Sequence, residues 1–434
     1  MIAQYVLDNG MTILIKEMHH APVASFWVWY RVGSGDERPG TTGISHWVEH
    51  MLFKGTPQFP KGEIDRQIAR CGGMSNGMTW LDFTTYLETL PAHEIDLGLR
   101  IEADRMANAL FEQEEVEAER TVIISERQGL ENDPRFLLDE EVKATAFRVH
   151  TYRYDIIGDL HDLQTMSRDD LWQHYKTHYV PNNAVAVLVG DVDANRARDR
   201  LAALFGPIPR GPDDMGGRRQ AYLRSPGTRH PEPEQRGERR VVREGEGGVS
   251  YLQAIYHVPQ ASHADFFPLL VMDAALTGPA AMAFSSGGST NRSSRLYKAL
   301  VETELAAAVG GSLAVSKDPY AYELGATVRT GRTLREVEDA LWAELDRLVA
   351  QSITPAELAK AIKQAKAQFA YAAEHVTNQA FWLGWSEMVA SHTWFEAYVE
   401  QLMAVTIQDV HRVAQKYLKP SNRTVGWYVP CRQA

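Results

Sequence analysis

Short apolar runs rich in β-branched and aromatic residues open the chain. Residues 5–7 and 12–15 form two such runs, and Asn9-Gly10 lies between them. Asn-Gly favours a tight turn between antiparallel strands. The pattern therefore predicts a β-hairpin at the start of the chain, and a third strand over residues 23–32.

A helix is predicted over residues 44–54, after a turn over residues 33–43 that is rich in glycine. Gly55 is expected to end this helix, because glycine readily adopts the backbone conformation found just after helix C-termini. Strands and helices are mixed without regular alternation. This favours an α+β fold, with mostly antiparallel sheets covered by helices, over a doubly wound parallel sheet.

The composition changes near the middle of the chain. Between residues 211 and 248, Gly, Pro, Arg, Glu and Ser predominate and large apolar residues are few, which is typical of a linker between domains. We therefore predict a first domain over residues 1–212, a linker over residues 213–245 and a second domain over residues 246–434.

A short pattern occurs once in each predicted domain. Each copy starts with Ser or Thr followed three positions later by Asp, a capping-box arrangement that begins a helix, and continues to a Pro/Asn turn. The constant spacing predicts two related domains with the same α/β-layered fold. The matching positions are Ser167, Asp170, Pro181 and Asn183 and, 239 positions later, Thr406, Asp409, Pro420 and Asn422.

The overall composition is that of a soluble globular protein. Of the 434 residues, 44% are hydrophobic and 23% are charged. Lys and Arg total 45 against 56 Asp and Glu, a formal charge of −11 that disfavours binding to nucleic acid. No apolar run approaches the ~18 residues of a membrane span, and the chain as given starts without a basic and then apolar leader. We expect a soluble protein without a membrane span or a nucleic-acid partner.

Cysteine is nearly absent. Cys71 and Cys431 are too few for a disulfide framework or a thiolate zinc site. Any metal site must therefore use histidine and carboxylate ligands.

The predicted helix carries such ligands at His46, Glu49 and His50. At 100° per residue, these three side chains fall within an arc of about 100° on one helix face. Two imidazoles one turn apart can bind the same ion. The carboxylate between them is then placed to deprotonate a water molecule beside that ion, in the mirror order of the His-Glu-x-x-His zinc helix.

The alternative is a helix whose histidines bind no metal. The neighbouring residues Ile44, Val48 and Met51 are apolar, so the helix is expected to be largely buried. Burying two imidazoles and a carboxylate is unfavourable unless a partner satisfies them. A zinc ion would satisfy them.

A catalytic zinc needs a third protein ligand and one position open to water. A second helix predicted over residues 113–128 is rich in glutamate, and its residues Glu119 and Glu126 lie two turns apart on one face. Spacing alone leaves the choice between them open, and a solvated acidic face accounts for most carboxylates of this kind. The neighbouring candidates are Glu114, Glu115 and Glu117.

Residues 43–56, Gly-Ile-Ser-His-Trp-Val-Glu-His-Met-Leu-Phe-Lys-Gly-Thr, resemble the inverted zinc motif of the pitrilysin (insulinase) family. This family contains insulin-degrading enzyme, the mitochondrial processing peptidases and two-subunit bacterial peptidases. Its third zinc ligand is a glutamate about 76 residues after the second histidine, at the end of a Glu-Arg-containing segment. Residues 119–126 match this segment, and Glu126 lies 76 positions after His50.

The resemblance implies that His46, His50 and Glu126 bind one Zn²⁺ per chain. It further implies that Glu49 is the general base and that Glu119 orients a ligand. Other matching segments are Gly72-Gly73, Asn76-Gly77-x-Thr79, Thr85-Tyr86, Pro181-x-Asn183 and residues 293–296.

In the family, the segment that matches residues 74–79 is an exposed edge strand to which the substrate peptide adds as a further strand. Asn76 and Gly77 correspond to substrate-binding residues of that strand. Without the resemblance, Asn-Gly at this place favours a plain turn.

The second half departs from the family pattern. Members that act alone have an arginine and a tyrosine after the segment matching residues 294–300, whereas residues 301–308 here read Val-Glu-Thr-Glu-Leu-Ala-Ala-Ala. Ser285 stands where the repeat spacing would place His46, so the second domain is expected to lack a metal site. Residues 276–291 also form a longer segment than the usual glycine loop.

The resemblance thus implies a zinc-dependent endopeptidase that hydrolyses peptides and forms the catalytic subunit of a heterodimer. A homologous partner would supply the missing arginine and tyrosine. The alternatives are a non-catalytic structural subunit of the same fold, like the core proteins of respiratory complexes, and a peptide-binding module with structural zinc. The choice between bacterial cytoplasm and periplasm stays open.

Overall fold

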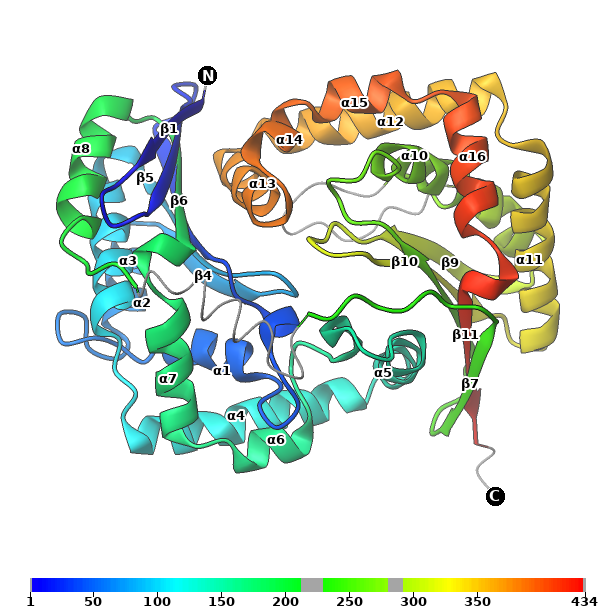
Figure 1. Ribbon diagram of the computed structural model, residues 1–434, viewed down its shortest axis with the longest axis horizontal. Helices are drawn as coiled ribbons and strands as arrows, with labels where there is room; N and C mark the ends of the chain where they lie inside the picture. Colours follow the sequence, from blue (N-terminus) through cyan, green and yellow to red (C-terminus); the bar gives the residue numbers. More distant parts are fainter. Residues whose placement is uncertain (1, 212–228, 280–291, 432–434) are drawn as a thin grey trace. The chain divides into compact units, whose positions relative to one another are not determined.

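The computed structural model describes residues 2–211, 229–279 and 292–431, which form two compact units (Figure 1). Each unit has its own sheet and its own helices. The first unit comprises residues 1–128, 154–230 and 373–392, and the second comprises residues 129–153, 231–372 and 393–434.

The first unit contains a six-stranded sheet in the order β1-β2-β6-β3-β5-β4, in which β2 and β6 are parallel and the other neighbours are antiparallel. The predicted hairpin is confirmed as β1 and β2. The strands are β1 (Ile2–Val6), β2 (Thr12–Glu17), β3 (Val23–Tyr30), β4 (Met74–Thr79), β5 (Thr84–Pro91) and β6 (Ala184–Gly190). The helices are α1 (Ile44–Met51), α2 (Glu63–Arg70), α3 (Ile95–Asn108), α4 (Gln113–Glu131), α6 (Leu160–Thr165), α7 (Arg168–His178), α8 (Ala194–Phe205) and α13 (Val376–Val389).

The second unit contains a five-stranded sheet in the order β7-β11-β8-β10-β9, in which β7 and β11 are the parallel pair. Its strands are β7 (Arg239–Gly245), β8 (Tyr251–Val258), β9 (Ala306–Leu313), β10 (Tyr320–Val328) and β11 (Arg423–Pro430). Its helices are α5 (Pro134–Ala146), α10 (Phe266–Leu276), α11 (Leu334–Gln351), α12 (Pro355–Ala373), α14 (His392–Glu396), α15 (Tyr398–Ala404) and α16 (Ile407–Tyr417).

The two sheets repeat one topology. The order β2-β6-β3-β5-β4 in the first unit corresponds to β7-β11-β8-β10-β9 in the second, with the parallel pair at the same place. Helices α7 and α16 both begin with the predicted capping boxes, Ser167 with Asp170 and Thr406 with Asp409. The predicted repeat and the α+β class with mostly antiparallel sheets covered by helices are confirmed.

The two units differ from the predicted domains by an exchange of helices. Helix α13 belongs to the predicted second domain by its place in the sequence, between β10 and β11, but it packs on β3 and β6 of the first sheet. Helix α5, from the first half of the chain, packs on β7, β8 and β11. A helix pattern shows which of its faces is apolar but not which sheet covers that face, so sequence reasoning did not find this exchange. Part of the predicted linker, residues 239–245, forms β7, and residues 213–228 lie outside the described residues.

Helix α13 explains why the central strands of the first sheet are apolar on both faces. Trp27 and Trp29 on β3 stack with ring centroids 5.4 Å apart, and both rings contact Phe381 of α13. The other face of β3 and its neighbour β5 packs against α3. A strand covered on both sides is expected to be a nearly continuous apolar run, as in β6.

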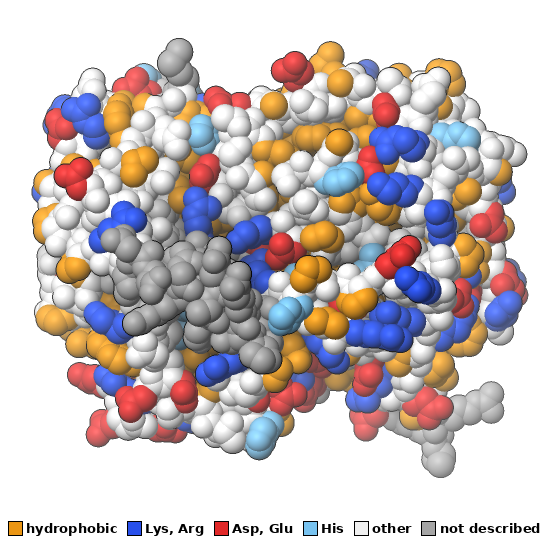
Figure 2. Space-filling model, viewed as in Figure 1, with side chains coloured by type: hydrophobic (Ala, Val, Ile, Leu, Met, Phe, Trp, Pro, Cys, Tyr) orange, Lys and Arg blue, Asp and Glu red, His pale blue; other side chains and the backbone are white. Residues whose placement is uncertain are grey.

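Acidic and basic side chains are both scattered over the face of the molecule that Figure 2 shows. Among the described residues, none of the helices combines the length and the hydrophobicity that a membrane-spanning helix requires.

The close packing of α13 on β3 gives a test of the helix exchange. A Cβ atom added at Gly384 would lie 2.0 Å from Nε1 of the buried Trp29. We expect Gly384→Ala to lower the free energy of unfolding by about 1–3 kcal/mol, because overpacking a core forces its neighbours to shift. Urea denaturation measures this change.

Gly129 in α4 is the matched control, since a Cβ atom added there meets nothing within 4 Å. Gly129→Ala should leave stability unchanged or raise it by up to about 1 kcal/mol, as alanine is the better helix former. A Gly384→Ala protein as stable as the wild type would contradict the packing of α13 described above.

Candidate metal centre

Helix α1 presents an apolar face to the interior and a polar face to α4. Trp47, Val48 and Met51 are buried without exposed surface. The helix ends at Met51 rather than at Lys54 as predicted, because the amides of Phe53 and Lys54 bond to carbonyls only three residues back. Gly55 follows this tighter turn, with a positive φ of 104°.

Two buried carboxylates hold the start of α1. The N-cap residue, Gly43, offers no side-chain cap, and Glu37 instead accepts hydrogen bonds from the amides of Gly43 at 2.7 Å and Ser45 at 2.8 Å. Burial raises the pKa of Glu37 to about 8, although these amide bonds oppose the rise. Asp162 accepts from the amide and hydroxyl of Thr42 at 2.9 and 2.7 Å. Glycine has no side chain that could cap a helix. The glycine before α1 was therefore the signal in the sequence that carboxylates from elsewhere in the chain accept these hydrogen bonds.

The side chains of His46, His50 and Glu126 converge in front of α1. The two Nε2 atoms lie 3.2 Å apart, and Glu126 Oε2 lies 3.9 Å from Nε2 of His46 and 3.8 Å from Nε2 of His50. Within residues 2–211, 229–279 and 292–431, one group of three or more His, Cys, Asp or Glu residues is close enough to hold a metal ion, and it consists of these three residues.

The donor set fits zinc. Zinc–ligand bonds of about 2.0–2.2 Å in a tetrahedral site place ligand atoms roughly 3.3–3.5 Å apart, near the spacing seen between the imidazole nitrogens. Burial, and next the neighbouring His50, lower the pKa of His46 to about 3, so this imidazole is neutral, as a ligand must be. That these residues bind zinc stays a prediction.

Glu119 lies on the other side of His50 from the convergence point. Its carboxylate accepts a hydrogen bond from His50 Nδ1 at 2.8 Å and pairs with the ammonium group of Lys54. Burial opposes ionisation of Glu119, but the bonds to His50 and Lys54 outweigh it and lower its pKa to about 2. With its proton on Nδ1, His50 has the Nε2 lone pair free for a metal. Lys54, one turn after His50, was missed by sequence reasoning.

Glu49 is buried between α1 and β4. Its Oε2 accepts a hydrogen bond from the Thr79 hydroxyl at 2.7 Å, and its charge interacts with those of His50 and Glu126. Burial raises the pKa of Glu49, and the bond from Thr79 partly offsets this. The geometry therefore brings a carboxylate next to the predicted ligands without making it one of them. Sequence reasoning assigned Thr79 no role.

Strand β4 is an edge strand of the first sheet, and Asn76-Gly77 lies within it rather than in a turn. The Trp80 amide bonds to the Phe83 carbonyl, and hydrogen-bonded pairs recur every second residue in antiparallel strands. The amides of Asn76 and Met78 therefore face β5, whereas that of Gly77 faces away from the sheet. In this structure the Gly77 amide donates to Asn76 Oδ1 at 2.9 Å.

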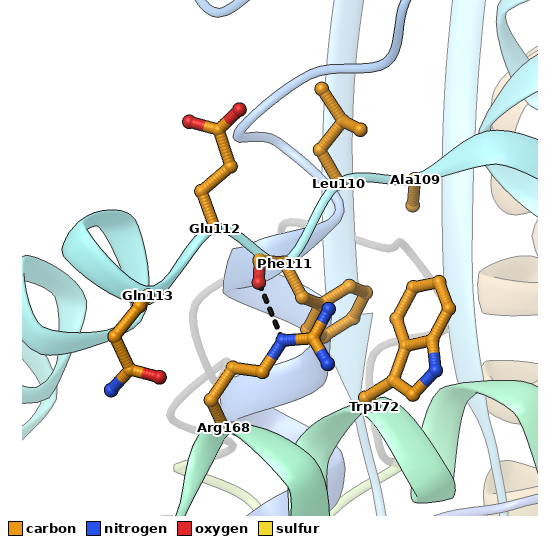
Figure 3. A pocket seen from close by; sticks show the side chains of 7 residues that line it. All are labelled: Ala109, Leu110, Phe111, Glu112, Gln113, Arg168 and Trp172. Carbon is orange, nitrogen blue, oxygen red and sulfur yellow. Dashed lines mark hydrogen bonds between the residues drawn. The ribbon is translucent and has the colours of Figure 1, made fainter.

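A separate pocket of about 400 Å³ lies between the α3–α4 connection and the start of α7 (Figure 3). None of the predicted site residues lines it. Its Arg168 donates from Nε to the Phe111 carbonyl at 2.8 Å, and its guanidinium lies over the Trp172 ring. Arg168 therefore braces the start of α7. The lining residues are Ala109, Leu110, Phe111, Glu112, Gln113, Arg168 and Trp172.

In the second unit, α10 takes the place of α1. It packs on α16 and β9, as α1 packs on α7 and β4. A Cβ atom at Gly311 of β9 would lie 2.8 Å from Asp273 of α10, and one at Gly77 of β4 would lie 2.8 Å from Glu49. The equivalent of α1 in the second unit is therefore α10, and not the position 239 residues after α1. The segments that connect these helices to the following strands differ in length between the two units. Ser285 itself, with residues 280–291, lies outside the described residues.

If Asp273 is aligned with Glu49, the positions of His46 and His50 are occupied by Leu270 and Ala274. Arg295, in the segment before residues 301–308, forms ion pairs with Glu357 and Glu344. Its contacts are those of a residue that supports the fold of the second unit.

Comparison with known proteins identifies the family of the chain. A profile described as Insulinase (Peptidase family M16) matches residues 12–160, and one described as Peptidase M16 inactive domain matches residues 165–365. The chain belongs to the insulinase family of peptidases, M16.

Two relatives and one solved structure match this M16 chain over almost its whole length. The zinc protease PqqE of Helicobacter pylori is 26% identical over 428 residues, which cover 98% of this chain and 92% of that protein. The mitochondrial-processing peptidase subunit beta of Lentinula edodes is 26% identical over 415 residues, or 95% and 86% of the two chains. The crystal structure of a protease from Helicobacter pylori has a TM-score of 0.90 and 25% identity, and the match covers 99% of both chains.

Zinc binding to this site should weaken as the pH falls. Burial lowers the pKa of His50, but its bond to Glu119 and the charges of Glu49 and Glu126 raise it overall, so protons compete with zinc for Nε2 at a higher pH than they would for an isolated histidine. Below that pKa, we expect the zinc dissociation constant to rise about tenfold per pH unit. Competition with a chelator at several pH values measures it. A dissociation constant independent of pH would contradict the assignment of His50.

Proposed function

We propose that this chain is a zinc-dependent endopeptidase that hydrolyses peptide bonds. The observation that carries the proposal is the place of Glu49, a buried carboxylate between the His46, His50 and Glu126 cluster and the edge strand β4. The names of two relatives, a zinc protease and a processing peptidase subunit, support the same reaction class.

In this proposal, His46, His50 and Glu126 hold the zinc ion. When bound, zinc would supply Lewis acidity that polarises the scissile carbonyl and acidifies a water molecule. Glu49 removes a proton from the attacking water and later delivers it to the leaving amine. Burial prepares Glu49 for both steps, because a raised pKa makes the carboxylate a better base and its protonated form more accessible.

The substrate would bind along β4. A peptide that pairs with this edge uses main-chain hydrogen bonds, which tolerate many side chains. The outward amide of Gly77 would donate to the peptide, and Asn76 would have to release that amide and turn its own amide group to the peptide backbone. Asn76 and Gly77 are thus the proposed substrate-binding residues, and Glu49 lies beside the same strand.

A non-catalytic subunit of the same fold is the second candidate. The description of the matched second-half profile as an inactive domain favours it for that half of the chain. The first half, by contrast, retains the three converging donors and Glu49. A module with purely structural zinc is less well supported, because structural sites usually have four protein ligands and need no base.

Glu49→Gln separates these functions. The variant should bind one equivalent of zinc, as the wild type does, and its peptide cleavage should fall by about 10²–10⁴-fold, since an amide cannot accept the proton. His50→Ala should lose both zinc and cleavage. Metal analysis and a fluorogenic peptide assay measure the two properties.

Glu114→Gln is the control, as it changes an exposed glutamate of α4. Zinc-loaded Glu49→Gln protein that cleaves peptides at the wild-type rate would refute the role of Glu49.

We further propose that the chain works with a homologous partner subunit. Residues 301–308 hold neither the arginine nor the tyrosine that family members acting alone are expected to use. Mixing the purified chain with its partner, isolated by co-purification from the native host, should raise cleavage at least tenfold (on the order of 1.4 kcal/mol). Full activity of the chain alone, with no gain from a partner, would contradict this proposal.

A further inference from the structure

The Glu49 carboxylate lies against two residues of β4. Oε2 accepts the hydroxyl hydrogen bond of Thr79 at 2.7 Å, and Oε1 lies 2.8 Å from the place where a Cβ atom of residue 77 would stand. Residues two apart in a strand point to the same face, so Gly77 and Thr79 both face α1. Gly77 leaves the space that the carboxylate occupies, and Thr79 supplies a donor at its edge.

This contact is shielded from water. Glu49 is 8% exposed and Thr79 is 6% exposed. A hydrogen bond from a hydroxyl to an ionised carboxylate is stronger than one between neutral groups, and it is stronger still where water does not compete. Thr is also restricted at χ1 by its branched Cβ, which keeps the donor in place. The Glu49 side chain has three rotatable bonds and could take several orientations. The hydrogen bond from the Thr79 hydroxyl holds it in one of them.

We infer that Thr79 is the positioning residue for Glu49, through the hydrogen bond of its hydroxyl to Oε2. The inference rests on the proposed function, since a fixed base matters only if Glu49 transfers protons. Because Thr79 is the last residue of the strand to which the peptide would add, it ties the position of the base to the position of the substrate. The orientation of Glu49 is then set by the same strand that sets the substrate backbone.

The competing explanation is that Thr79 only fills buried space. Two substitutions separate shape from hydrogen bonding: Thr79→Val keeps the shape and removes the hydroxyl, and Thr79→Ser keeps the hydroxyl and removes the methyl group. Thr85→Val is the matched control. It removes another buried threonine hydroxyl, which donates to the Val28 carbonyl at 2.9 Å in the neighbouring strand pair.

The kinetic experiment measures kcat and KM for each zinc-loaded variant, with metal content and thermal midpoint. Thr79→Val should lower kcat about 10–100-fold and leave KM within about threefold, because a displaced base slows the chemistry and not the binding. Thr79→Ser and Thr85→Val should keep kcat within about threefold. The inference would be overturned if kcat fell equally in Thr79→Ser and Thr79→Val, or if Thr79→Val kept the wild-type kcat.

Crystal structures of the zinc-free wild type and variants give a readout that does not depend on activity. The Glu49 carboxylate should occupy one position in the wild type and in Thr79→Ser, and should rotate or spread over several positions in Thr79→Val. An unmoved carboxylate in Thr79→Val would overturn the inference by itself. If the wild type cleaves no peptide but the carboxylate moves only in Thr79→Val, the proposed function fails and the positioning role stands.

Discussion

Two imidazole nitrogens that face each other at 3.2 Å, with a carboxylate oxygen less than 4 Å from both, form the constraint on which the rest of the site depends. Lone pairs brought this close in a partly buried place repel one another unless a proton or a cation lies between them. Burial lowers the pKa of His46 and so keeps that imidazole neutral, and the tautomer in which His50 donates from Nδ1 to Glu119 directs the Nε2 lone pair of His50 to the same point. A divalent cation bound by all three groups would satisfy this arrangement.

The surrounding elements keep this constraint in place. Glu37 and Asp162 accept hydrogen bonds from the residues at the start of α1. Glu119 pairs with Lys54 and accepts from Nδ1 of His50, and the Thr79 hydroxyl of β4 donates to Glu49. All these groups lie on helices or strands, or on loops fixed by buried hydrogen bonds. The exchanged helix α13 buries the far side of the same sheet against Trp27 and Trp29. Rigid supports of this kind hold a site more accurately than mobile loops do.

Local patterns in the sequence predicted local structure well. The spacing of His46 and His50 follows from the helical period, and the Asn9-Gly10 hairpin and the two capping boxes depend on neighbouring residues only. Glu126 could be chosen over Glu119 only through the family resemblance, because both lie on the same face of α4 and the decision depends on how α4 packs on α1.

Features set by contacts distant in sequence were not predictable from it. The bond from Thr79 to Glu49 joins residues 30 positions apart, and the packing of Phe381 on Trp27 joins residues much further apart. The same reason explains the mistaken repeat position at Ser285. Insertions between the helices and strands change the spacing, whereas the order of strands in the sheet is kept.

The central claim is that α1 and α4 together form a zinc site with three protein ligands. Anomalous diffraction at the zinc absorption edge, from crystals of zinc-loaded protein, tests it most directly. The account predicts one strong peak about 2.0–2.2 Å from Nε2 of His46, Nε2 of His50 and a carboxylate oxygen of Glu126, with no fourth protein ligand. A peak elsewhere, a fourth ligand from the protein, or no peak at this place would contradict it.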